Sequence, residues 1–259
     1  MWQNIKELYR YRSLIAALVQ RHLSMRYRGS LLGFLWTLLN PLCLMLVYTV
    51  VFRYYIRFNQ VENYTIFLFC GLLPWLWITS ALTEGVGSVV ASGHLITKSM
   101  FPAQVLPAVA VLTTLINFLL SLPILFLFML ATGMPFKLTL LALPGLIALQ
   151  FVFLFGMVLA LSSLNVHYRD IQHLVSNILT FLFFLCPIVY PASSVPERFR
   201  FSLTLNPFAL ITQSYHMLIL EGVLPPLSSA IYLSAWAVLC VVLGGMIYTH
   251  YRESFAELL

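Results

Sequence analysis

Two stretches near the amino terminus decide the fold class. They are GSLLGFLWTLLNPLCLMLVYTVVF at residues 29–52 and NYTIFLFCGLLPWLWITSALT at residues 63–83. Neither contains Asp, Glu, Lys or Arg, over 24 and 21 residues respectively. A helix needs roughly 20 apolar residues to cross a bilayer core of about 30 Å, and a helix satisfies its own backbone hydrogen bonds in lipid. The sequence therefore predicts that both stretches are membrane-spanning helices.

The composition of the whole chain supports this interpretation. Of its 259 residues 61% are hydrophobic and 8% are charged, and the mean hydropathy is +0.94. Soluble domains are roughly 25% charged, so this chain lacks the polar residues to cover a water-facing surface. Four further apolar runs lie within residues 105–130 and 138–164 and at about 174–190 and 228–248. We therefore predict an all-α membrane protein with six transmembrane helices.

Residues 191–226 interrupt this pattern. Residues 201–220 are free of charge apart from histidine, but they carry several Ser, Thr, Asn and Gln side chains that a lipid-exposed helix would leave unpaired. We expect short re-entrant outer helices here, between spans five and six, which dip into the protein without crossing. The chain is then one domain: an interfacial helix at 1–28, spans one to five at 29–190, the outer segment at 191–226, and span six with a tail at 227–259.

The first 28 residues predict an amphipathic helix in the membrane interface. Its apolar and polar positions recur at steps of three and four residues, with Ile5, Leu8, Tyr11, Ile15, Leu18 and His22 on one face and Lys6, Arg10, Ser13, Ala17 and Arg21 opposite. The segment has no short apolar core followed by a small-residue cleavage site, so we do not expect a secretory signal peptide.

The basic residues predict the orientation. The net charge is +6 and the pI about 9.3, but the basic residues form no patch with interleaved aromatics, which argues against nucleic-acid binding. With the amino terminus inside, cytoplasmic segments hold nine Lys and Arg residues, six of them before span one, and outer segments hold five. Both termini are therefore expected in the cytoplasm, although Arg53 and Arg57 just outside span one oppose this bias.

The chain shows no means of energy coupling of its own. Its apolar cores contain no Asp or Glu, which argues against ion-coupled transport. No lysine follows glycine in a phosphate-binding Gly-Lys-Ser or Gly-Lys-Thr motif. ATP hydrolysis, if it is used, must come from another polypeptide.

A polar cluster at residues 167–173 is open to two interpretations. His167, Asp170 and His173 are metal-ligating residue types, and a membrane-embedded enzyme could use them, but steps of three residues drift round a helix and give poor three-ligand geometry. The alternative is a tight cytoplasmic turn held by Arg169 and Asp170. The four cysteines form no metal-ligand or CxxC spacing and are expected to behave as small buried hydrophobic residues.

Five motifs carry a family resemblance. They are RYRGSLLGFLWTLLNP (26–41), LITKSMFPAQVLP (95–107), NVHYRDIQH (165–173), CPIVYPASSVP (186–196) and NPFALITQSYHMLILEG (206–222). In this order they resemble the ABC-2 type permease subunits of bacterial polysaccharide exporters, which serve O-antigen, capsule or teichoic-acid export. The resemblance covers nearly the whole chain.

This resemblance implies partners and a location. It implies a homodimer in the bacterial plasma membrane, with a separate ATPase subunit beneath each copy. ATP and Mg would be bound by that partner, and no cofactor by this chain. By similarity, Lys98, Phe101 and Pro102 match the coupling helix, and Arg169 and Asp170 match a second contact with the ATPase. The outer segment, with Pro196, Asn206 and Pro207, matches the family's outer gate.

The resemblance also implies a substrate, a lipid-linked polysaccharide. Sugars stack on aromatic rings, so Trp36 and Tyr48 are candidate channel-lining residues, although aromatic residues near span ends also form ordinary interfacial belts. Arg26 and Arg28 precede span one, where a guanidinium pair could bind a pyrophosphate or merely anchor anionic lipid. The alternatives are a membrane enzyme acting on a polyprenyl phosphate and an ABC-2 permease for a small drug or lipid.

Overall fold

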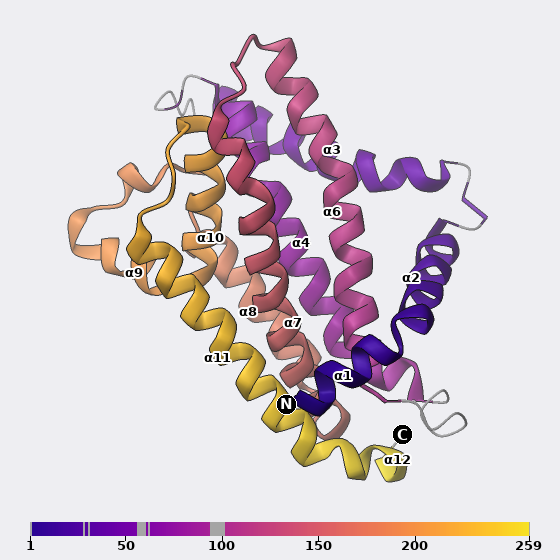
Figure 1. Ribbon diagram of the computed structural model, residues 1–259. Helices are drawn as coiled ribbons and strands as arrows, with labels where there is room; N and C mark the ends of the chain where they lie inside the picture. The colour runs from indigo at the N-terminus through magenta and orange to yellow at the C-terminus, as the bar shows by residue number, and fades with distance from the viewer. Residues whose placement is uncertain are drawn as a thin grey trace.

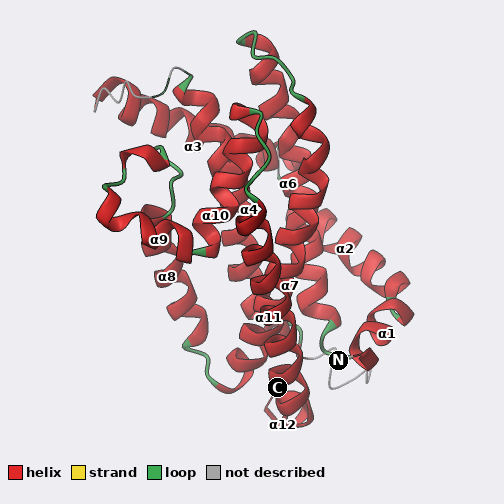
Figure 2. Ribbon diagram, turned by 60° about the vertical axis from the view of Figure 1, so that its left-hand side comes forward, coloured by secondary structure: helices red, strands yellow, loops and turns green. Residues whose placement is uncertain are grey.

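The computed structural model describes residues 2–27, 29–30, 32–55, 61, 63–93 and 102–258. Throughout these ranges every regular element is a helix (Figures 1 and 2). In chain order the elements are α1 (Trp2–Arg10), α2 (Arg12–Tyr27), η1 (Gly33–Leu35), α3 (Trp36–Thr49), η2 (Val50–Tyr55), α4 (Tyr64–Ala91), α6 (Val105–Ala131), η3 (Leu138–Ala142), α7 (Leu143–His167), α8 (Ile171–Leu185), η4 (Ala192–Ser194), η5 (Glu197–Phe199), α9 (Arg200–Leu205), α10 (Pro207–His216), η6 (Met217–Glu221), α11 (Leu227–Tyr251), η7 (Arg252–Ser254) and α12 (Phe255–Leu258).

Among the described residues, five helical segments are long and apolar enough to cross a membrane. They are Trp36–Tyr55, Tyr64–Ala91, Val105–Ala131, Leu138–His167 and Leu227–Ser254. Each coincides with one of the six apolar runs that the sequence predicts as spans. The chain is therefore a multi-pass, all-helical membrane protein over the part that the structure describes.

The expected fifth span is the exception. It corresponds to α8, whose 15 residues end at Leu185. Cys186 is extended, with φ −100° and ψ 142°, because the following Pro187 disfavours the helical conformation of the residue before it. At about 1.5 Å per residue the helix is about 22 Å long, shorter than a bilayer core of about 30 Å. The structure thus contains one short apolar helix at this position.

The expected first span begins later than predicted. Gly29 and Gly33 have φ of 82° and 48°, in the left-handed region that glycine adopts readily, and α3 begins only at Trp36. The helix then continues as a π-helical segment through Arg53 to Tyr55. In Figure 1, α3 crosses the upper part of α6 at a steep angle and does not run along it.

The centre of the bundle is α4. It contacts α3, α6, α7, α8 and α10, and 78% of its most apolar window is buried inside the protein. The helix α4 is therefore surrounded by protein on nearly every side. Its burial fixes the positions of the helices around it.

Small residues allow α7 and α11 to pack closely. A Cβ atom added at Gly156 would collide with the backbone of Cys240 and Val241, and one added at Gly244 would collide with the carbonyl of Gly156. Backbone atoms cannot move aside as a flexible side chain can, so these positions require glycine. Such small-residue contacts are typical of helix packing in membranes.

The outer segment returns into the bundle through α10. The Tyr215 hydroxyl on α10 donates to Oε1 of Gln150 on α7 at 2.8 Å, and Nε2 of Gln150 donates to the carbonyl of Pro74 at 3.3 Å. Nε2 of His216 lies 3.0 Å from the carbonyl of Phe67. The polar residues Thr212, Ser214, Tyr215 and His216 of this stretch are thus buried against protein and hydrogen-bonded, whereas Nε2 of Gln213 has no partner among the described residues.

The amino-terminal segment forms two helices where one was expected. The helical pattern is interrupted at Tyr11, between α1 and α2. Ile15 and Val19 of α2 are buried against Val105 and Val109 at the start of α6. The apolar face predicted from the sequence is therefore partly covered by protein, which fixes α2 beside the bundle.

Candidate functional site

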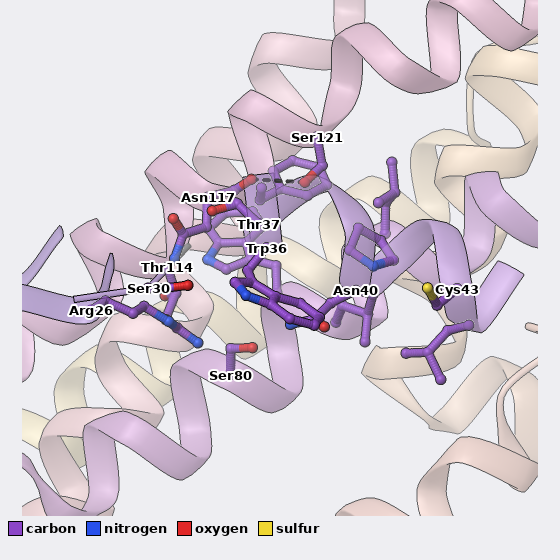
Figure 3. Close-up of a pocket in the computed structure, with 16 residues that line it drawn as sticks. Arg26, Ser30, Trp36, Thr37, Asn40, Cys43, Ser80, Thr114, Asn117 and Ser121 are labelled. Atoms are coloured by element: carbon purple, nitrogen blue, oxygen red, sulfur yellow. Dashed lines mark hydrogen bonds between the residues drawn. The ribbon is translucent and has the colours of Figure 1, made fainter. Parts of the chain in front are cut away.

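A cavity of about 790 Å³ with many polar lining residues lies between α3, α4 and α6 in the part of the chain that the structure describes. We call it the chamber. Its polar lining consists of Arg26, Ser30, Trp36, Thr37, Asn40, Ser80, Thr114, Asn117 and Ser121. In Figure 3, Arg26, Ser30 and Ser80 gather around Trp36 at one end, while Cys43 lies at the other. The chamber thus has a charged end and a less polar end, which suits an amphiphilic ligand.

An ion pair closes the charged end. Nη1 of Arg26, at the end of α2, lies 3.0 Å from Oε1 of Glu84 on α4. The two side chains are 43% and 38% exposed. Solvent screens a pair of this exposure, so its net contribution to stability is at most about 1 kcal/mol.

One face of α6 supplies the wall opposite α3. Thr114, Asn117 and Ser121 recur at steps of three and four residues, which places them on one side of the helix. The hydroxyls of Thr114 and Ser121 donate to carbonyls of their own helix, so their oxygens can still accept a hydrogen bond. This wall therefore offers acceptors to a ligand that carries hydroxyl groups.

Two buried atoms of the chamber's lining have no hydrogen-bond partner among the described residues. They are Nε1 of Trp77 and Oδ1 of Asn117. The Trp77 ring is 2% exposed and stacks on Phe118 with ring centroids 4.9 Å apart. An unpaired buried donor or acceptor costs about 1–3 kcal/mol, so this pair marks a place where a polar ligand or water would be favourable.

A second cavity of about 410 Å³ lies between α3, α4 and α8, and we call it the groove. The groove combines aromatic rings with a double row of hydroxyls: Tyr48, Trp75, Phe183 and Phe184 beside Thr79, Thr83, Ser176 and Thr180. Tyr48 stacks on Phe183 with centroids 5.7 Å apart and planes at 25°. Rings and hydroxyls together match the two faces of a sugar.

The structure divides the predicted substrate residues between these cavities. Arg26 and Trp36 line the chamber, and Tyr48 lines the groove. Leu44 and Leu76 line both, so the two cavities lie on either side of the contact between α3 and α4. Arg28 lies outside the residues that the structure describes.

The predicted coupling residues are described only in part. Lys98 and Phe101 lie outside the described residues, while Pro102 is half-buried just before α6. Arg169 and Asp170 are exposed in the turn between α7 and α8. No ion pair joins these two described residues, so the expected interaction between them is wrong; the turn is instead closed by the Ile171 amide, which donates to the carbonyl of Tyr168 at 3.1 Å.

Two of the three predicted gate residues form the start of α10. The Asn206 side chain caps the helix, because its Oδ1 accepts a hydrogen bond from the amide of Phe208 at 3.0 Å, and Pro207 occupies the first turn. Nδ2 of Asn206 also lies 3.5 Å from Sγ of Cys186. Pro196 is exposed and precedes η5, away from this cap.

The structure gives the alternative metal centre no support. No group of three His, Cys, Asp or Glu residues with metal-ligand geometry occurs in the described part of the chain. Nε2 of His167 lies 2.9 Å from the Ser254 hydroxyl, and its ring packs against Tyr251 with centroids 4.4 Å apart. His167 therefore joins α7 to the carboxyl-terminal segment.

Sequence reasoning missed Glu84 and the polar face of α6. Glu84 lies 58 residues from Arg26, so no local spacing connects them. The polar face of α6 could have been predicted from the sequence, because Thr114, Asn117 and Ser121 share one helical face within an otherwise apolar run.

Comparison with known proteins identifies the family. The ABC-2 type transporter family matches residues 13–220. The chain is 40% identical over 255 residues, 98% of each chain, to the O-antigen export system permease protein RfbA of Myxococcus xanthus. It is 33% identical over 248 residues, 95% of each chain, to a Klebsiella pneumoniae protein of the same name. It is 24% identical over 243 residues to the polysialic acid transport protein KpsM of Escherichia coli, covering 93% of this chain and 94% of that protein. The chain therefore belongs to the ABC-2 type transporter family.

Proposed function

We propose that this chain is the permease subunit of an ATP-driven exporter that moves a lipid-linked polysaccharide out across the bacterial plasma membrane. The observation that carries the proposal is the full-length similarity to permeases named for O-antigen export. The two cavities beside α3 support it, because one is amphiphilic and the other pairs aromatic rings with hydroxyls.

The proposed topology has six spans and both termini in the cytoplasm. Five spans are the long helices, and the sixth is α8 followed by the extended residues 186–190. The basic residues before α3 support the orientation, since cytoplasmic segments carry an excess of Lys and Arg. In this topology α1 and α2 lie in the inner membrane interface and α10 re-enters from outside.

The proposed assembly is a homodimer with two copies of an ATPase subunit. Only 11% of the most apolar window of α3 is buried inside one chain, and Leu46 and Val47 are 61% and 53% exposed. A second copy packed on this side would turn each groove inward toward a shared path. Lys98, Phe101 and Pro102, with Arg169 and Asp170, would contact the ATPase.

The proposed path begins at the chamber. A phosphate of the lipid carrier binds at Arg26, and Arg28 adds a second guanidinium to the same site. The carrier's apolar chain extends along the less polar end of the chamber. The glycan passes the ring of Trp36 and follows the groove past Tyr48 toward the outer gate formed by the start of α10. Stacking and accepted hydrogen bonds are individually weak, which permits a long polymer to move in steps.

The test is a deletion strain. Loss of this chain is expected to leave finished polysaccharide inside the cell, and expression of the intact gene should restore it to the surface. Purified alone, the chain should hydrolyse no ATP, and activity should appear with a copurifying nucleotide-binding subunit. Normal surface polysaccharide in the deletion strain, with a drug or a lipid accumulating instead, would indicate a small-molecule permease. Hydrolysis or transfer on a polyprenyl phosphate by the isolated chain would indicate an enzyme.

A further inference from the structure

We propose that Glu84 makes the headgroup site selective for a carrier with more than one negative charge, because it occupies Arg26 until such a phosphate displaces it. This inference rests on the proposed function, which places a phosphorylated carrier at Arg26. Without such a filter, the same guanidinium would bind the abundant anionic lipids of the membrane, which attract any basic residue near the surface.

The geometry of the pair fits a competitor that can be displaced. Arg26 and Glu84 meet through one nitrogen and one oxygen, 3.0 Å apart. The side chains remain 43% and 38% exposed, so water can replace either partner. Exposed ion pairs contribute little to stability, so a phosphate that binds Arg26 more tightly than Glu84 does can break this pair at a small cost in free energy.

The position of Glu84 fits the same role. It follows Ser80 by four residues on α4, which places both on one face of the helix. Ser80, Ser30 and Arg26 form the charged end of the chamber, where a phosphate oxygen would find hydroxyl donors beside the guanidinium. A phosphate that displaces Glu84 thus gains contacts that the carboxylate does not make.

Charge decides which ligands can displace Glu84. The phosphodiester of a bulk phospholipid carries one negative charge, as Glu84 does, and must compete with a carboxylate that is tethered at the site. A pyrophosphate carries at least one charge more and presents several oxygens to the planar guanidinium fork. Glu84 therefore lowers the occupancy of the site by weakly bound anionic lipids, while a pyrophosphate-linked carrier binds tightly enough to fill it.

The experiment measures binding of farnesyl pyrophosphate to the full chain in nanodiscs of phosphatidylcholine, with and without phosphatidylglycerol. Glu84→Gln should bind the probe about fivefold more tightly than the unmodified chain in phosphatidylcholine, the upper end of what an exposed ion pair contributes. Added phosphatidylglycerol should weaken binding to Glu84→Gln and leave the unmodified chain nearly unaffected. Glu197→Gln, which removes the partner of Arg200 in the outer segment with the same change of charge, should behave as the unmodified chain.

The outcomes separate this inference from the proposed site. Equal affinity and an equal response to phosphatidylglycerol in the unmodified chain and Glu84→Gln would overturn the role of Glu84 alone. Binding to Arg26→Gln as tight as to the unmodified chain would overturn the headgroup site and this inference with it. If Glu84→Gln assembles poorly, Glu84→Asp, with a shorter carboxylate, should shift affinity in the same direction by less; no shift there contradicts the proposal.

Discussion

The helices α3 and α4 are neighbours in the chain and are both strongly apolar, but they differ in their surroundings. Both are apolar enough to cross a membrane, yet 11% of the most apolar part of the first and 78% of that of the second are buried inside the protein. Hydropathy measures how readily a segment leaves water. It does not say whether lipid, a second chain or the same chain takes the place of water.

This difference in burial indicates which residues hold the fold together and which are available to a substrate. Because α4 is enclosed by five other helices, its residues hold the fold together. The sparsely covered α3 and one side of α4 together line both the chamber and the groove. Substitutions at the fully buried positions of α4 should accordingly affect stability, and substitutions on the exposed side of α3 should affect transport.

The largest expected effect is on the packing of α4. A Cβ atom at Gly85 would collide with the side chain of Val158, whose branched Cβ leaves it little freedom to move. Gly85→Leu should lower the free energy of unfolding by about 3 kcal/mol or prevent assembly. Val47→Leu on the exposed face of α3 is the matched control. Thermal unfolding of both purified variants measures their loss of stability. Equal losses in the two variants would contradict the inference that α4, and not α3, holds the fold together.

A smaller loss is expected when the support of α4 by α10 is cut. Gln150→Leu removes the partner of the Tyr215 hydroxyl and a donor to the Pro74 carbonyl. An unpaired buried group costs about 1–3 kcal/mol, and thermal stability should fall accordingly. Asn40→Leu, at an exposed position of α3, should leave thermal stability unchanged. A stable Gln150→Leu protein would show that water or a shifted side chain replaces the lost hydrogen bonds.

The smallest effect concerns transport without a change in stability. Tyr48→Ala removes the ring that stacks on Phe183 in the groove. Export should slow by about fivefold, since one aromatic stacking contact is worth about 1 kcal/mol, while Tyr48→Phe keeps the ring and most of the rate. The export rate of labelled polysaccharide, at equal protein level, provides the measurement. An unchanged rate in Tyr48→Ala would remove Tyr48 from the path.

The sequence predicted the membrane-spanning helices well where apolar composition alone identifies them. Long uncharged runs identified α4, α6, α7 and α11, because crossing lipid depends on composition over about 20 residues. The exact ends of the helices were harder to predict from the sequence. Gly29 and Gly33 delay the start of α3, and Pro187 shortens α8, because single residues control the backbone there.

The candidate site was predictable only in part. Arg26 and Trp36 were found because they lie at the start of a span, where a headgroup would sit. Glu84 and Asn117 approach the chamber from other helices, and their role depends on how the helices pack. Packing partners are not encoded in local spacing, so this information comes only with the fold.

Photocrosslinking in exporting cells shows most directly which side of the molecule the polysaccharide touches. A photoreactive benzoylphenylalanine placed at position 36 or 48 should form a covalent adduct with the glycan in exporting cells. The same residue at position 246, where Met246 is 64% exposed on α11, should form none. Adducts at position 246 with none at positions 36 and 48 would contradict the assignment of the path to α3.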